Sequence, residues 1–148
     1  MNTGRLGSMS LVLEKEMFAA NKILSCRWVA IFSRVRTDRN LILNGYQTRC
    51  IVSGAVHEFI TCEDQDRVSP INRVGYLGFA EFLTAGVIAV GDELWLDGDH
   101  LLGHVLGFDD THMPNHQNIV FQVATIVTGS ESGLVPDQEF CIRSPRSS

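Results

Sequence analysis

The chain of 148 residues is long enough for one domain of ordinary size and too short for two. With 45% hydrophobic and 20% charged residues, its composition is that of a globular protein and excludes the disordered, collagen-like and coiled-coil classes. The net charge is −5, and no stretch approaches the roughly 18 apolar residues of a membrane span, so we expect a cytoplasmic protein that binds no membrane.

Charge is distributed unevenly along the chain. From Val74 to Ile142 there are ten acidic residues and no Lys or Arg, whereas the remainder carries all 12 basic residues and seven acidic ones. Phosphate binding needs clustered cations, and the arginines of the first half are spread along apparent strands, so nucleic acid is excluded as a partner. The acidic segment either keeps loops hydrated or attracts a metal ion or an amine.

The two ends of the chain lie outside the expected domain, which spans residues 9–142. Residues 1–8 end in Gly7-Ser8 directly before a second methionine, a pattern typical of a segment left by cloning. Residues 143–148 are polar and are expected to fray. From Leu11 to Leu24 the apolar spacing fits either a short helix or the start of a strand, and the sequence leaves both open.

Beyond this segment, β-branched and aromatic residues come in short runs bounded by Gly, Asn, Asp and Pro. The expected strands are Trp28–Val35, Leu41–Leu43, Thr48–Ile60, Val74–Phe79, Val87–Val90, Glu93–Leu96, Leu101–Phe108, Asn118–Thr128 and Glu139–Ile142. Asp97-Gly98-Asp99 predicts a tight antiparallel hairpin between the sixth and seventh of them. The sequence therefore predicts an all-β fold, a small antiparallel β-barrel with one ligand inside it or at its mouth, and a sandwich as the second choice.

Four cysteines, Cys26, Cys50, Cys62 and Cys141, lack the spacing of a zinc knuckle or a redox pair. Their neighbours are apolar, so we expect reduced cysteines in the core.

The segment from Gly107 to Asn118 carries the densest group of chemically active side chains. It contains Asp109, Asp110, His112 and His116, and Pro114 disfavours a helix there. In one interpretation an aspartate orients an imidazole that moves a proton. In a second, His112, His116 and one aspartate bind a divalent metal ion. In a third, the segment is a hydrated loop whose side chains cap its own backbone.

Further candidates lie outside this loop. Glu81 is a lone carboxylate among apolar residues, and it either faces water or acts as a second acid beside the histidines. The expected substrate-binding residues are two aromatic and two amide side chains: Tyr76, Trp95, Asn115 and Asn118. The dipeptide His57-Glu58 is interpreted as a surface pair at a strand end.

Motifs that hold a nucleotide or carry a nucleophile are missing. The glycines between Gly75 and Gly78 match neither phosphate-binding pattern, and Glu131 stands where a serine nucleophile would be required in Gly129–Gly133. We therefore expect no cofactor.

Three segments carry a resemblance: Val74–Phe82, Gly91–Leu94 and Gly107–Val120. Together they resemble a small, uncharacterised family of bacterial proteins found near biosynthetic genes, over about Arg49–Ile142. In layout only, Gly91–Leu96 and Gly129–Phe140 are similar to the barrel-shaped IIA component of glucitol/sorbitol phosphotransferase systems. That family's phosphate-accepting histidine would fall near Phe79–Glu81, where this chain has none, so phosphoryl transfer is not expected.

Together these observations favour a cofactor-independent enzyme that catalyses a cyclisation, isomerisation or elimination on a small biosynthetic intermediate. His112 or His116 would be the base, Asp109 or Asp110 the orienting carboxylate, and Glu81 a second acid. The alternatives are a non-catalytic small-molecule-binding barrel and a metal-dependent enzyme that uses the same loop. A homodimer is the expected oligomer.

Overall fold

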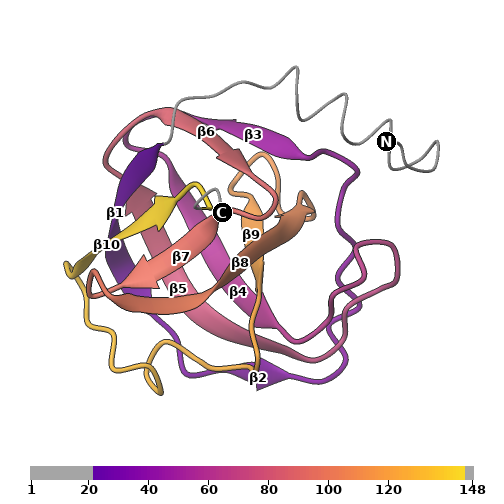
Figure 1. Ribbon diagram of the computed structural model, residues 1–148. Helices are drawn as coiled ribbons and strands as arrows, with labels where there is room; N and C mark the ends of the chain where they lie inside the picture. The colour runs from indigo at the N-terminus through magenta and orange to yellow at the C-terminus, as the bar shows by residue number, and fades with distance from the viewer. Residues whose placement is uncertain (1–21, 146–148) are drawn as a thin grey trace, which may run out of the picture.

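The computed structural model describes residues 22–145, which form ten strands (Figure 1). The strands are β1 (Ile23–Ile31), β2 (Val35–Arg36), β3 (Thr48–Ile51), β4 (Val56–Cys62), β5 (Val74–Phe82), β6 (Gly86–Ala89), β7 (Glu93–Leu96), β8 (His100–Asp109), β9 (Asn118–Gln122) and β10 (Glu139–Arg143). Among these residues there is no helix, and hence none long and apolar enough to cross a membrane. The expectations for residues 1–8, and the choice between helix and strand for residues 11–21, lie outside the described residues.

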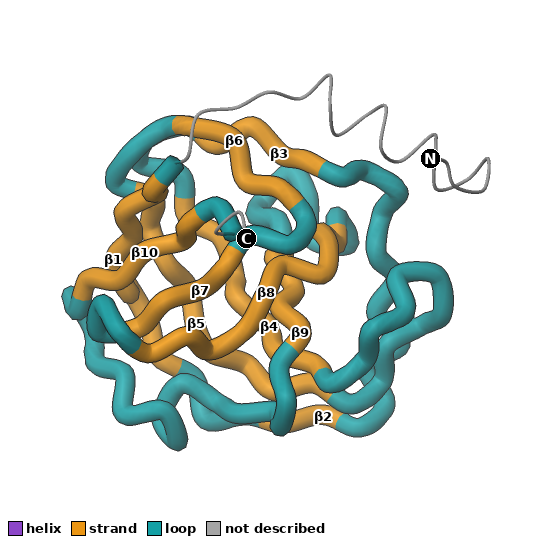
Figure 2. Tube along the Cα trace, viewed as in Figure 1, coloured by secondary structure: helices purple, strands orange, loops and turns teal. Residues whose placement is uncertain are grey.

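The main sheet closes on itself as a ring (Figure 2). Its strand order is β1-β10-β7-β8-β9-β4-β5, and β5 pairs with β1 to complete the circle. Every pairing around the ring is antiparallel except that of β4 with β9, which is parallel. The short β2 pairs antiparallel with one end of β5. β3 pairs with β6 in a separate two-stranded sheet. The all-β prediction is confirmed, and closure leaves the long strands of the ring paired on both sides.

Local turn chemistry explains both the correct strand predictions and the wrong ones. The hairpin between β7 and β8 forms as predicted, with positive φ at Asp97 (56°) and Gly98 (83°). The predicted strand Thr48–Ile60 is instead two strands, because the chain turns at Gly54, whose φ is +90°. The predicted strand Leu41–Leu43 is reduced to a single bridge between Leu41 and Ile71.

Aromatic side chains fill the interior of the ring. Trp28 stacks on Phe140 with ring centroids 4.3 Å apart, and Phe59 packs against both of them and against Phe121. All four side chains are buried. These side chains form the core of the ring, and the pockets described below are lined by residues on its outer surface.

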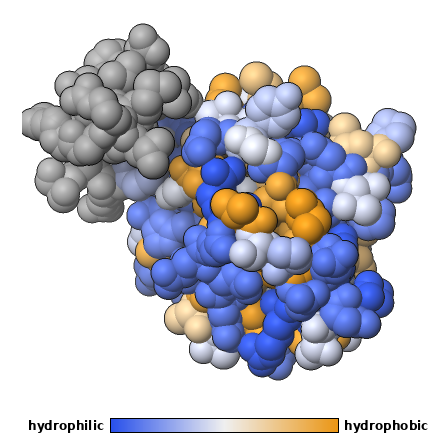
Figure 3. All heavy atoms as spheres, turned by 90° about the vertical axis from the view of Figure 1, so that its right-hand side faces the viewer, coloured by the Kyte–Doolittle hydropathy of each residue, from blue (hydrophilic) through white to orange (hydrophobic). Residues whose placement is uncertain are grey.

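A second apolar cluster covers part of the outside of the ring. Ile60 and Tyr76 face outward from β4 and β5 and pack beneath Leu41 and Ile71, which come from the loops on either side of β3 and β4. Arg67 fastens these loops together by donating from Nε to the carbonyl of Leu106 at 2.7 Å and from a terminal nitrogen to the carbonyl of Tyr46. Figure 3 shows the right-hand side of the view in Figure 1, where a small group of hydrophobic residues lies within a mostly hydrophilic surface. The adjoining outer surface of β4 and β5 is not covered in this way.

Two of the four cysteines match the prediction of core thiols. Cys26 and Cys62 are buried, Cys141 is half-buried, and Cys50 is exposed on β3. All four are free thiols. Cys50 departs from the prediction because alternate residues of a strand face opposite sides, and Ile51 takes the buried side.

Candidate functional site

A carboxylate and an imidazole meet on the outer surface of the ring. Glu58 stands near the start of β4, and His116 precedes β9 by two residues. Because β4 and β9 run parallel with Glu58 opposite Asn118, the loop before β9 passes directly over Glu58. His116 Nε2 lies 3.4 Å from Glu58 Oε1, and only 13% and 12% of the two side chains are exposed. The fold thus brings together two residues that are 58 positions apart.

Two rings hold the imidazole of His116 in place. His112 stacks on it with centroids 5.1 Å apart, and Phe79 of β5 meets it edge-on, also at 5.1 Å. The loop is compact because the amides of Asn115 and His116 both donate to the carbonyl of His112. The imidazole is therefore presented by a folded loop on a rigid sheet, as catalytic and binding groups commonly are.

Several buried polar atoms near this point of the chain lack a hydrogen bond. Of the six such side-chain nitrogen and oxygen atoms among the described residues, four belong to the residue before Glu58 and to residues 116–118: His57 Nδ1, His116 Nε2, Gln117 Oε1 and Asn118 Oδ1. Buried polar groups in folded proteins are nearly always hydrogen-bonded. His116 Nε2 is therefore a buried nitrogen that lies near a carboxylate without forming a regular hydrogen bond to it.

Burial shifts the acidity of the site. It raises the pKa of Glu58, and the nearby imidazoles of His116 and His112 and the Arg39 guanidinium act against that rise. It also lowers the pKa of His57, and Arg49 and His116 add to this effect. A carboxyl with a raised pKa beside an imidazole is a typical arrangement for proton transfer near neutral pH.

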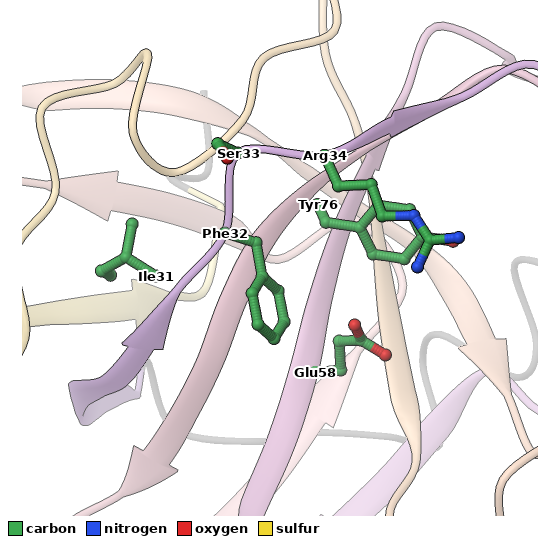
Figure 4. Close-up of a pocket in the computed structure, with 6 residues that line it drawn as sticks. All are labelled: Ile31, Phe32, Ser33, Arg34, Glu58 and Tyr76. Carbon is green, nitrogen blue, oxygen red and sulfur yellow. The ribbon is translucent and has the colours of Figure 1, made fainter.

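Two pockets flank the Glu58–His116 pair. The first, which we call the Arg34 pocket, has a volume of about 290 Å³ (Figure 4). It is lined by Ile31, Phe32, Ser33, Arg34, Glu58 and Tyr76. The second, the His116 pocket, has a volume of about 270 Å³ and is lined by Val29, Val56, Phe79, Asn115 and His116. Phe32 of the first pocket packs edge-on against Phe79 of the second at 5.4 Å, so the pockets share a wall.

Comparison with known families places this site within a recognised group of sequences. A family described as a family of unknown function, DUF6917, matches residues 18–143, which include all ten strands and the histidine loop. The chain belongs to DUF6917. No curated protein and no solved structure matches it.

In this DUF6917 chain the two aspartates of the loop do not bind the imidazoles of His112 and His116. Their carboxylates instead accept hydrogen bonds from other side chains and from the loop backbone. Asp109 is buried and accepts hydrogen bonds from Arg39, from the amide and hydroxyl of Thr111, and from Asn118 Nδ2 at 2.7 Å. Asp110 accepts hydrogen bonds from Asn44 at 2.7 Å and from Gln117. The carboxylate that faces His116 is therefore Glu58, in the position that the sequence suggested for Asp109 or Asp110.

Some of the remaining predicted residues lie at this site, and the others lie elsewhere in the protein. Tyr76 lines the Arg34 pocket and Asn115 lines the His116 pocket, whereas Asn118 is buried beside Asp109. Glu81 is on the same outer face but forms an ion pair with Arg27. Trp95 lies elsewhere on the ring, where its indole Nε1 donates to Glu93 at 2.9 Å and Arg143 stacks on it.

The described residues do not form a ready-made metal centre. Within residues 22–145 no group of three His, Cys, Asp or Glu side chains is placed to hold a metal ion. His112 and His116 are stacked ring on ring, and the two aspartates that would complete the set are hydrogen-bonded to other residues. Among the described residues, the two histidines and the two aspartates of the loop are therefore not arranged as one ligand set.

Sequence reasoning missed Glu58, Arg34, Phe32 and Phe79. The dipeptide His57-Glu58 was noticed, but a strand-end pair is a common surface feature, and nothing local joins it to the loop at His116. The missing information was the parallel pairing of β4 with β9, which has no short-range signal in the chain.

Proposed function

We propose that this protein is an enzyme that acts on a small molecule by acid–base chemistry, with His116 and Glu58 as the proton-transfer pair. The observation that carries the proposal is the pair itself: an imidazole and a carboxylate, 3.4 Å apart and nearly buried, between two pockets. Its chemistry fits a cyclisation, isomerisation or elimination, in which a proton leaves one atom of the substrate and is returned to another.

We give each member of the pair a role that is consistent with its contacts. A carboxylate beside Nε2 favours the tautomer that carries its proton on Nε2, which leaves Nδ1 as the basic nitrogen. His116 then accepts the substrate proton at Nδ1, and Glu58 stabilises the imidazolium that results. The same imidazolium returns the proton to the product, so the pair is regenerated without a cofactor. His112, stacked on His116, helps to fix the plane of the ring.

The experiment that tests the proposal is deuterium incorporation from a metabolite mixture. The full chain is incubated in D₂O with a bacterial small-molecule extract, and masses are compared with those obtained from His116→Ala and Glu58→Gln proteins. We expect the wild type to label or convert at least one metabolite and both variants to lose that activity. The matched control is Glu81→Gln, which removes a carboxylate on the same face that is paired with Arg27, and it should keep the activity.

Two results would contradict the proposal. The first is a conversion that persists in the His116→Ala protein. The second is a metabolite that is bound by the wild type and recovered unlabelled and unchanged, which would show a binding protein rather than an enzyme.

A further inference from the structure

Arg34 stands apart from the other basic side chains. Within residues 22–145 its guanidinium has no hydrogen bond and no ion pair. Every other Lys or Arg in that range has a carboxylate or carbonyl partner, namely Lys22, Arg27, Arg36, Arg39, Arg49, Arg67, Arg73 and Arg143. The Arg34 side chain is exposed at the rim of a pocket, and no described residue accepts a hydrogen bond from its guanidinium.

The backbone and an aromatic ring fix the place of this guanidinium. The carbonyl of Arg34 accepts a hydrogen bond from the amide of Tyr76 at 2.9 Å, which ties the residue to β5. The guanidinium carbon lies 5.6 Å from the centroid of the Tyr76 ring, a distance at which a cation is attracted to an aromatic face. The donors of Arg34 therefore stay over the pocket, although no acceptor among residues 22–145 holds them there.

The rest of the Arg34 pocket provides flat apolar surface and one acid. In Figure 4 the rings of Phe32 and Tyr76 and the carboxylate of Glu58 face a common gap, with the guanidinium of Arg34 over Tyr76. Tyr76 is 7% exposed, so its ring forms part of a fixed wall. A planar group between Phe32 and Tyr76 would contact both rings and would reach Glu58 at its far end.

We infer that the Arg34 pocket binds an oxyanion, a carboxylate or a phosphate, that is attached to a flat apolar group. The planar fork of a guanidinium pairs with either oxyanion through two parallel hydrogen bonds. This assignment of a substrate class rests on the proposed function, because it places the oxyanion of the substrate at the rim and its reacting end toward Glu58, which is itself in contact with His116.

Two carboxylates in one pocket would repel each other if they met, and the geometry separates them. Glu58 lies beside His116 and near His112 and Arg39, which offset its charge. The ligand's own oxyanion pairs with Arg34 on the other side of the apolar gap. We therefore expect a ligand whose acidic group and reacting group are at opposite ends.

The test uses three one-ring probes and the isotope-labelled full chain. Benzoate, phenyl phosphate and the neutral benzamide are titrated, and backbone amide shifts are followed by NMR. We expect benzoate or phenyl phosphate to shift the amides of Ser33, Arg34 and Tyr76 with a dissociation constant of about 1 mM, in keeping with so small a ligand. Benzamide should bind about tenfold more weakly, and the relative affinity of the two anions shows whether the site takes carboxylate or phosphate.

Two arginine variants make the test specific. Arg34→Gln should weaken binding of the preferred anion about tenfold, because it removes the charge-assisted hydrogen bonds. Arg36→Gln is the matched control: Arg36 is two positions away, pairs with Asp38 and does not line the pocket, so its loss should leave the affinity unchanged within about twofold. Among the described residues the Arg34 guanidinium forms no hydrogen bond or ion pair, so the variant protein should remain folded.

The inference would be overturned if benzamide bound as tightly as the anions, if Arg34→Gln left the affinity unchanged, or if the shifts spread equally to Arg36 and Arg73. These outcomes are separate from the fate of the proposed function. A metabolite that needs His116 for conversion but is neutral and insensitive to Arg34→Gln would overturn the inference alone.

Discussion

Replacing Asp109 with alanine should destabilise the protein by about 3–5 kcal/mol. This loss would be structural, because the hydrogen bonds of Asp109 go to Arg39, Thr111 and Asn118 and not to Glu58 or His116. The side chain of Asp109 is 1% exposed and that of its partner Arg39 is 10% exposed, so the substitution leaves a buried guanidinium without its carboxylate. Thr111 and Asn118 also lose their acceptor. Each buried donor left unsatisfied costs about 1–3 kcal/mol, which agrees with the range expected for breaking a buried ion pair.

The assay is urea unfolding followed by circular dichroism. A loss of 3–5 kcal/mol in a domain of this size lowers the melting temperature by about 10–16 °C. Asp38→Asn is the control, because Asp38 is also paired with an arginine but its side chain is 82% exposed, and its loss should scarcely change stability. A loss below about 1 kcal/mol for Asp109→Ala would refute the conclusion that Asp109 fastens the loop to the ring.

Three further predictions concern the thiols, a close backbone approach and the pH dependence of stability. Burial raises the pKa of the Cys62 thiol to about 12, so iodoacetamide at about pH 8 should alkylate exposed Cys50 in the native protein and leave Cys62 unmodified, as mass spectrometry of peptides would show. Gly78→Ala should cost about 1–3 kcal/mol in urea unfolding, because the new Cβ would lie 2.0 Å from the carbonyl oxygen of Ala30 and the φ of +150° disfavours a side chain. Burial also raises the pKa of Glu58, so its protonated form contributes stability below the ordinary carboxyl value of 4.5 that is lost as the pH rises through the raised value. In the wild type, the free energy of unfolding should therefore decline between pH 4.5 and neutral pH. In the Glu58→Gln protein this decline should be smaller, because the group that titrates is gone.

Each of these predictions has its own control. In denaturant all four cysteines should react, and native labelling of Cys62 at the rate of Cys50 would contradict the burial argument. Gly45→Ala should be nearly neutral, since nothing lies within 4 Å of the added carbon, and an equal loss at both glycines would show that the close approach is not the cause. Parallel stability curves for the wild type and Glu58→Gln would show that burial of Glu58 does not shift its titration.

The elements predicted correctly are those that depend on neighbouring residues. Asp97 and Gly98 accept positive φ, and the apolar runs on either side fix the β7–β8 hairpin, so local chemistry is sufficient there. The break at Gly54 was missed because the residues on both sides of it favour strands. The all-β character follows from many such local signals added together.

The uneven charge along the sequence has an explanation that only the fold reveals. Acidic residues of the segment Val74–Ile142 pair with basic residues from the other part of the chain, in the pairs Lys22–Asp92, Arg27–Glu81, Arg39–Asp109 and Arg49–Asp110. The two parts are therefore complementary within one domain. The sequence shows the imbalance, but the pairing depends on strand order, which it does not encode locally.

The candidate site was predicted in part for the same reason. The loop with His112 and His116 was found from its composition, because imidazoles and carboxylates are dense there. The carboxylate partner was assigned to Asp109 or Asp110 because they are close in sequence, whereas the structure places Glu58 against His116 through the parallel β4–β9 pairing.

The most direct test of the account is kcat/KM for the converted metabolite in the wild type, His116→Ala and His112→Ala proteins at matched melting temperatures. A proton-transfer group contributes about 10²–10⁴-fold to a rate, so His116→Ala should lose about that much. His112 stacks on His116 and is not the imidazole that lies 3.4 Å from Glu58, so His112→Ala should lose less than about tenfold. Full turnover by His116→Ala, or an equal loss in both variants, would contradict the assignment of His116 and Glu58 as the acting pair.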